Sequence, residues 1–177
     1  MDELIVRILP ELDEAGTVKH VQGELDLPAY ESGRGEFRLL DGLSYDAYLS
    51  HTGDSILLTG TIKGRAMGSC DRCLEDAVFD IDGELEGLYF IRTDSPLMQD
   101  MEEDEYEIIG DSDVIDLTNA VLASLAFETP FVLLCSEDCK GLCPHCGSNL
   151  NEGDCGCAQD HVDPLNPFAA LKGLKFD

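Results

Sequence analysis

Apolar and polar residues alternate along much of the first half of the chain, and this alternation predicts β-strands. In the clearest case, residues 79–91, most odd positions are apolar: Phe79, Ile81, Leu85, Tyr89 and Ile91. The even positions carry several aspartates and glutamates, so one face of this strand is apolar and the other faces water. Looser or shorter apolar patterns occupy four other stretches: 4–9, 18–27, 43–49 and 55–67. Prolines and glycine turns separate them, which is typical of an antiparallel sheet.

A change of period after residue 115 predicts a central helix over 116–128. Asp116 is a suitable N-cap, and Pro130 ends the segment. One face of this helix is apolar, with Leu117, Val121, Leu122 and Leu125. Near the end of the chain, Asn166 followed by Pro167 predicts a second, short helix over 169–174.

Charge and the absence of apolar runs restrict the compartment and the partners. The 177 residues include 37 acidic and 11 basic side chains, a formal net charge of −26. Such a chain repels nucleic-acid backbones at long range and favours a basic partner, for example a ribosomal protein. The first residues do not form a secretory signal, and no apolar run approaches the ~20 residues of a membrane span. We therefore expect a cytoplasmic protein with no membrane partner.

Eight cysteines are the most specific chemical feature of the sequence. Six lie between Cys135 and Cys157, in the pattern Cys-x3-Cys-x3-Cys-x2-Cys-x8-Cys-x-Cys, and the others are Cys70 and Cys73. In a reducing compartment, thiols at such spacings indicate metal ligands, and four thiolates suit Zn²⁺. Because a shell made only of cysteine leaves no open position for a substrate, we expect structural zinc.

Two partitions of the ligands are possible. In the first, two zinc ions each bind four cysteines: Cys70, Cys73, Cys135 and Cys139 in one site, and Cys143, Cys146, Cys155 and Cys157 in the other. In the second, one zinc binds four of the six clustered cysteines, and the first pair only lies nearby. The last two cysteines are separated by a single residue, so strain is expected if both reach one ion. His145 and His161 are alternative ligands, although a solvated loop position is the simpler explanation of each.

Together these features predict an α+β fold. We expect a mainly antiparallel, curved β-sheet with one packed central helix, a cysteine-rich zinc loop and a short C-terminal helix. Residues 1–130 should form the β-rich domain with its central helix, and residues 131–177 the zinc-stapled loop and C-terminal helix packed on the same domain. The stretch 94–113 is acidic, its charge run 100–105 should be a loop, and Tyr106, Ile108 and Ile109 should form a short strand just after it.

Motifs for other chemistry are missing from the sequence. It contains no phosphate-binding glycine loop, no His-Glu-x-x-His and no Gly-x-Ser-x-Gly. We therefore predict no enzymatic activity and no small-molecule substrate. Two other classes stay open: a thiol-redox or redox-switch protein that uses Cys70 and Cys73, and an acidic module that mimics nucleic acid on a basic partner.

Several unrelated motifs occur in an order that resembles one known family. They are Ser-Cys-Asp-Arg-Cys-Leu at 69–74, Glu-Thr-Pro-Phe-Val at 128–132, Asp-Cys-Lys-Gly-Leu-Cys-Pro-His-Cys-Gly-Ser-Asn-Leu-Asn at 138–151, and Asp-Pro-Leu-Asn-Pro-Phe-Ala-Ala-Leu-Lys at 163–172. In this order they resemble the YceD family, the large ribosomal RNA subunit accumulation proteins. The N-terminal strands are similar only in pattern.

The resemblance implies a role in accumulation of 23S ribosomal RNA, and so in assembly of the large ribosomal subunit, without known catalysis. Some members of this family keep the first cysteine pair and lack the later cluster, which favours zinc as a local replacement for hydrophobic core. The expected partner is a large-subunit precursor, contacted through a basic ribosomal protein or through 23S RNA. The cations available for RNA are Arg65, Arg72, Lys140, Lys172 and Lys175.

Overall fold

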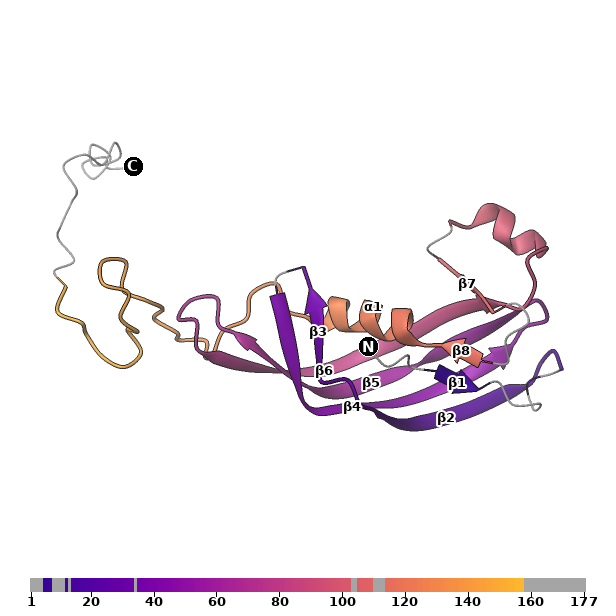
Figure 1. Ribbon diagram of the computed structural model, residues 1–177, viewed down its shortest axis with the longest axis horizontal. Helices are drawn as coiled ribbons and strands as arrows, with labels where there is room; N and C mark the ends of the chain where they lie inside the picture. The colour runs from indigo at the N-terminus through magenta and orange to yellow at the C-terminus, as the bar shows by residue number, and fades with distance from the viewer. Residues whose placement is uncertain are drawn as a thin grey trace, which may run out of the picture.

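The computed structural model (Figure 1) describes residues 5–7, 12, 14–33, 35–102, 105–109 and 114–157. Its main feature is a six-stranded sheet with the order β2-β4-β5-β6-β7, in which β3 also pairs with β4. The strands are β2 (Val18–Leu25), β3 (Ala29–Ser32), β4 (Gly35–His51), β5 (Ser55–Ser69), β6 (Asp76–Phe90) and β7 (Glu107–Ile108). Each strongly alternating stretch of the sequence therefore lies within a strand.

The sheet is mixed, but most of its strand pairs are antiparallel, as the sequence predicted. Each pair is antiparallel except β6 and β7, which run in parallel at Tyr89 and Phe90. Between the two strands the chain includes the 3-10 helix η2 (Pro96–Asp100), and β7 lies at the same end of the sheet as the end of β6. The predicted curvature of the sheet and the domain boundary at residue 130 stay predictions.

Two further elements lie beside the sheet (Figure 1). Strand β1 (Ile5–Arg7) pairs antiparallel with β8 (Val114–Asp116), and together they form a separate two-stranded sheet. Helix α1 (Thr118–Glu128) follows β8 and is the one α-helix in the described part of the chain. The predicted C-terminal helix, 169–174, lies outside the described residues.

The central helix begins close to its predicted start. Leu117, and not Asp116 as predicted, occupies the N-cap position, but the Asp116 carboxylate accepts a hydrogen bond from the backbone N–H of Thr118 at 2.8 Å. At the other end, the backbone N–H of Thr129 donates to Leu125 O at 3.0 Å, and Pro130 follows. The helix therefore forms between the two signals that the sequence contained.

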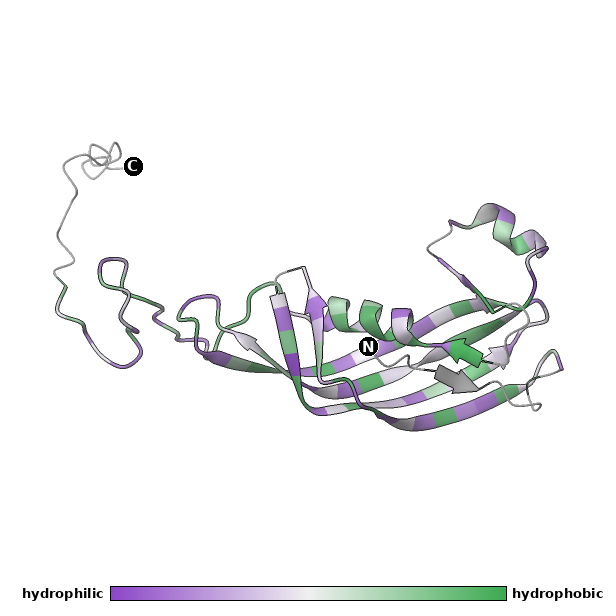
Figure 2. Cartoon of the chain, in the orientation of Figure 1, coloured by the Kyte–Doolittle hydropathy of each residue, from purple (hydrophilic) through white to green (hydrophobic). Residues whose placement is uncertain are grey.

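The core lies between α1 and the apolar face of the sheet. Figure 2 shows apolar and polar residues alternating along the long strands, as a strand with one buried face requires. Gly83 on β6 lets the helix approach closely, since a Cβ at this position would lie 2.5 Å from Ser124 Oγ. The fully buried large side chains come from β4, β5, β6, β8 and α1: Leu43, Leu49, Ile56, Leu58, Ile62, Ile81, Leu85, Phe90, Ile115, Leu117 and Leu125, together with Leu12.

Candidate metal centres

The first cysteine pair lies on the turn between β5 and β6. Cys70 follows the last residue of β5, and its backbone N–H donates to Glu75 O at 2.7 Å. The N–H of Leu74 donates back to Cys70 O at 3.0 Å, and Leu74 adopts a positive φ of 66°. This tight turn holds the thiols of Cys70 and Cys73 on one side, which is the geometry of a zinc knuckle.

The segment after Pro130 contacts this turn through Asp71. The backbone N–H of Asp71 donates to Leu133 O at 2.8 Å, and the N–H of Leu133 donates to Asp71 Oδ2 at 2.7 Å. These two bonds attach the incoming chain just before Cys135. Asp71 is thus a positioning residue that the sequence argument did not identify, although it lies inside the quoted motif.

Arg72 fixes the next part of the segment. Its guanidinium Nη1 donates to Cys139 O at 2.9 Å, and its own carbonyl oxygen accepts the N–H of Leu142 at 3.2 Å. From the sequence, Arg72 was a cation available for RNA, but in the structure its guanidinium binds the carbonyl oxygen of Cys139. Arg65 in the same set pairs with Asp41, and Lys172 and Lys175 lie outside the described residues.

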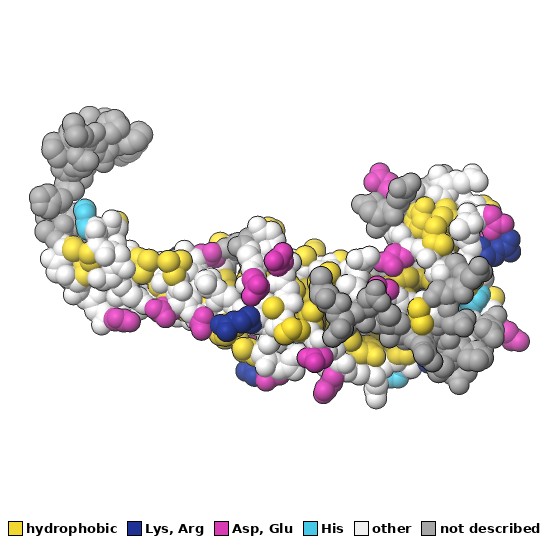
Figure 3. Space-filling model, viewed as in Figure 1, with side chains coloured by type: hydrophobic (Ala, Val, Ile, Leu, Met, Phe, Trp, Pro, Cys, Tyr) yellow, Lys and Arg dark blue, Asp and Glu magenta, His cyan; other side chains and the backbone are white. Residues whose placement is uncertain are grey.

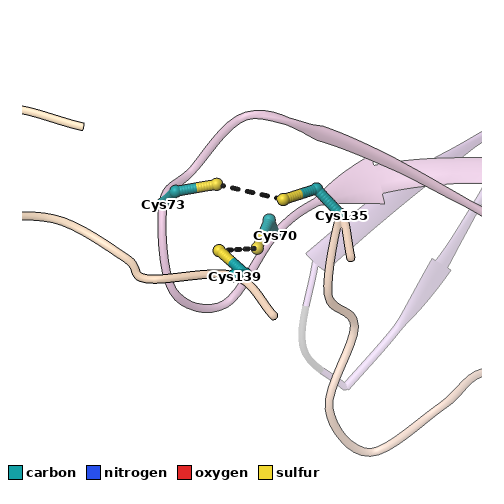
Figure 4. Close-up of side chains that lie close together, drawn as sticks. All are labelled: Cys70, Cys73, Cys135 and Cys139. Carbon is teal, nitrogen blue, oxygen red and sulfur yellow. Dashed lines mark hydrogen bonds between the residues drawn. The ribbon is translucent and has the colours of Figure 1, made fainter. Parts of the chain in front are cut away.

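These contacts bring four sulfurs together (Figure 4). We call Cys70, Cys73, Cys135 and Cys139 the sheet cluster. The Sγ atoms of Cys73 and Cys135 are 3.5 Å apart, those of Cys70 and Cys139 are 3.7 Å apart, and all four lie within 4.8 Å of one another. A tetrahedron of sulfurs at ~2.3 Å from a zinc ion has edges of roughly 3.8 Å. The donor set therefore fits a tetrahedral Zn²⁺, and the spacing is too long for disulfides.

The thiols of the sheet cluster differ in acidity. Burial raises the pKa of Cys70, but the backbone N–H groups of Cys73, Arg72 and Cys135 outweigh it and lower the pKa to about 6. The N–H of Glu75 lowers the pKa of Cys73, but burial and the neighbouring sulfurs raise it to about 12. Four thiolates at this spacing repel one another, and a divalent cation removes that repulsion.

The other four cysteines form a second group, which we call the loop cluster: Cys143, Cys146, Cys155 and Cys157. A small hairpin carries its first pair, with a bridge between Leu142 and Asn149. Within it, the N–H of Cys143 donates to Ser148 O at 2.8 Å, and the N–H of Gly147 donates to Cys143 O at 2.9 Å. The Ser148 hydroxyl and N–H lower the pKa of Cys146 to about 6.

The closely spaced pair Cys155 and Cys157 reaches the same site. Gly156 between them has a φ of 71°, a left-handed conformation that glycine adopts without a Cβ penalty. The residue in the middle of the pair therefore lets the chain turn so that both sulfurs reach the same group. The neighbouring sulfurs of the loop cluster raise the pKa of Cys157 to about 12, so this group also needs a cation to hold four thiolates.

Asn151 lies in the loop between the two cysteine pairs of the loop cluster and contacts the sheet cluster. Its Nδ2 donates to Cys139 Sγ at 3.4 Å, and its Oδ1 accepts the backbone N–H of Lys140 at 2.8 Å. Of all the contacts of Cys139, this hydrogen bond to its sulfur has the largest effect on the pKa of the thiol, which it lowers. Such outer contacts orient metal ligands. Asn151 belongs to the motif at 138–151, but no spacing rule pointed to this role.

The eight cysteines are therefore grouped as in the first of the two predicted partitions. His145 is exposed and lies in neither group, while His161 lies outside the described residues. That each group binds an ion stays a prediction.

In the described part of the chain, no helix is long and apolar enough to cross a membrane.

The described residues thus form an open sheet with two four-cysteine groups beyond one end. The family model of the large ribosomal RNA subunit accumulation protein YceD matches residues 58–175. The chain belongs to the YceD family, as its motif order predicted.

Relatives extend the comparison. An uncharacterized protein of Mycobacterium tuberculosis is 33% identical over 122 residues, which cover 69% of this chain and 58% of the relative. A protein named large ribosomal RNA subunit accumulation protein YCED homolog 1, chloroplastic, from Zea mays is 36% identical over 61 residues, 34% of this chain and 20% of the relative. The matched region thus spans little more than half of the mycobacterial protein. No solved structure matches the chain.

Proposed function

We propose that this protein is a non-enzymatic factor that promotes accumulation of 23S ribosomal RNA and assembly of the large ribosomal subunit. The family match over residues 58–175 carries this proposal, because it includes the β5–β6 turn, α1 and both cysteine clusters. The name of the maize relative points to the same process. We expect the protein to act in the cytoplasm, where large-subunit precursors form.

We further propose that each cluster binds one structural Zn²⁺. Two observations support this: the four sulfurs of each group lie within 4.8 Å of one another, and all donors are thiols. Zinc bound by four thiolates has no open position, so it would supply folding energy rather than chemistry. In the sheet cluster the ion would hold the segment 131–139 against the end of the sheet.

We propose that the direct contact with the large-subunit precursor is made through a basic ribosomal protein. The net charge of −26 favours this partner over bare RNA, because like charges repel at long range. Two of the cations once considered for RNA, Arg65 and Arg72, have acceptors within the protein.

Depletion of the protein in its own host tests the function. We expect the ratio of 23S to 16S ribosomal RNA to fall and large-subunit precursors to accumulate in sucrose gradients. Re-expression of the wild-type chain should restore both. Normal gradients and a normal RNA ratio after verified depletion would contradict the proposal.

Metal content tests the structural zinc separately. We expect elemental analysis of the freshly purified chain to return two zinc ions per molecule, with all eight thiols protected from alkylation until a chelator is added. A stable disulfide between Cys70 and Cys73 in place of bound metal would favour the thiol-redox alternative instead.

A further inference from the structure

Strand β6 has an open edge over most of its length. Strand β5 pairs with it from Asp76 to Phe90, whereas β7 pairs only with Tyr89 and Phe90, and no other described strand pairs with it. Such an edge presents unpaired backbone N–H and C=O groups to any chain that can add as a further strand.

The register shows which backbone groups point outward. Glu75 O accepts from Cys70 on the β5 side, whereas Phe90 O accepts from Ile109 on the opposite side. Because residues along an antiparallel ladder bond alternately to the two sides, the even-numbered residues of β6 direct their backbone groups to the open edge. These are Asp76, Val78, Asp80, Asp82, Glu84, Glu86 and Leu88.

A groove lies between this edge and helix α1. It has a volume of about 560 Å³, and Glu84 and Glu86 line it from β6 while Ala123 and Phe127 line it from α1. A second hollow shares Glu86 and Ala123 and continues toward β7. The alanine leaves room beside the helix, and the Phe127 side chain is 90% exposed.

One polar group in the groove has no partner. Ser124 lines the groove and is only 7% exposed, and its hydroxyl makes no hydrogen bond within the described residues. A buried hydroxyl without a partner is costly, and a polar group of an incoming chain would satisfy it. This observation is independent of the open edge.

The charge beside the edge is negative and partly uncompensated. Lys63 on β5 pairs with Asp82 at 3.1 Å. By contrast, Glu84 and Glu86 face Thr61 and Thr59 across the ladder, and no ion pair to either glutamate is found among the described residues. Figure 3 shows more acidic than basic side chains on the visible face.

We propose that the β6 edge binds an extended segment of a basic protein, which adds to the sheet as a strand. Its side chains would alternate between two environments. One set would face the apolar surface of Ala123 and Phe127, and the other would lie beside Glu84 and Glu86. The segment therefore alternates apolar residues with lysine or arginine.

Charge excludes two other occupants. A second copy paired edge to edge would bring two acidic rows together, and RNA would bring phosphates to the same row. The inference goes beyond the proposed function, which can hold even if the ribosomal contact is made elsewhere.

A designed peptide tests the inference on the full, metal-loaded chain. The probe is a nine-residue peptide that alternates valine and lysine, and a peptide that alternates valine and glutamate is its control. We expect the lysine peptide alone to bind, with amide NMR shifts confined to β6 and α1. Shifts elsewhere, or no binding of the lysine peptide at millimolar concentration, would overturn the inference.

Matched variants locate the site. The double variant Glu84→Lys with Glu86→Lys should weaken binding about tenfold or more, because it reverses the charge beside the edge. Glu24→Lys, on β2 at the opposite edge of the sheet, should change the dissociation constant less than about twofold. Ala123→Trp should also weaken binding, since the exposed side chain of Ala123 lines the groove. Equal binding of the peptide to the wild type and to all three variants would contradict the proposal. It would also be contradicted if the wild-type protein formed a dimer or bound RNA and the double variant did not.

Discussion

The two cysteine clusters have the same ligands but different surroundings. Three thiols of the sheet cluster are buried, and Cys70, Cys73 and Cys139 belong to the continuous hydrophobic core with Leu133. In the loop cluster only Cys143 is buried, and it lies outside that core. Figure 1 shows the chain after the sheet cluster extending away from the end of the sheet. If each cluster binds zinc as proposed, the same metal chemistry would close the end of a core in one place and fold a short loop in the other.

This difference predicts different consequences when each ion is lost. Removal of the sheet-cluster zinc should loosen the β5–β6 turn and the segment attached to it. Removal of the loop-cluster zinc should affect mainly residues 140–157, whose hydrogen bonds to the β5–β6 turn and the sheet cluster include those of Leu142 to Arg72 and of Asn151 to Cys139. Four variants sharpen the comparison, from the largest expected effect to the smallest.

Cys70→Ser should have the largest effect. It removes a fully buried ligand, so we expect one zinc to be lost and the free energy of unfolding to fall by more than about 3 kcal/mol. Urea denaturation followed by circular dichroism, together with zinc analysis, measures both. A stability equal to the wild type would mean that the sheet cluster contributes nothing to the core.

Cys146→Ser should also release one zinc, but its effect should stay local, because Cys146 is exposed. We expect hydrogen exchange to increase in residues 140–157, while the urea midpoint of the sheet stays unchanged. Loss of protection in β4, β5 or β6 would show that the two clusters fold as one unit.

Asp71→Ala should destabilise the junction between the β5–β6 turn and the segment after Pro130. The variant leaves the N–H of Leu133 without its carboxylate acceptor, which should cost about 1–2 kcal/mol. Asp71→Asn keeps an acceptor oxygen and is the matched control, so it should restore most of the loss. Equal destabilisation by both variants would indicate that charge, and not this hydrogen bond, is responsible.

Gly156→Ala should have the smallest effect. A Cβ at a φ of 71° costs about 1 kcal/mol, which corresponds to roughly fivefold faster transfer of the loop-cluster zinc to a chelator. Gly33→Ala is the control, since Gly33 has open space around it and no positive φ, and its zinc transfer should be unchanged. An unchanged rate of zinc transfer in Gly156→Ala would show that the turn accommodates the Cβ without weakening the zinc site.

Much of the fold was predicted from local sequence patterns. The features that were not predicted depend on contacts between separate segments of the chain. The strands around residues 43–49 and 79–91 and the helix after Asp116 were predicted because alternation and capping act over a few residues. The parallel β6–β7 pair was missed, because its partners are separated by an acidic stretch without a clear period. The roles of Asp71 and Arg72 were missed because their partners lie 62 and 67 residues away. The role of Asn151 was missed because no local period links it to Cys139, 12 residues away.

The sequence by itself determined the period of the strands, the position of the central helix, the charge and the presence of enough thiols for two tetrahedral sites. Only the tertiary structure decided which thiols meet, which strand edge stays open and which acidic residues lie beside it. Side-chain identity acts locally, whereas these features depend on contacts between separate segments of the chain, such as the two hydrogen bonds that join Asp71 to Leu133, 62 residues away.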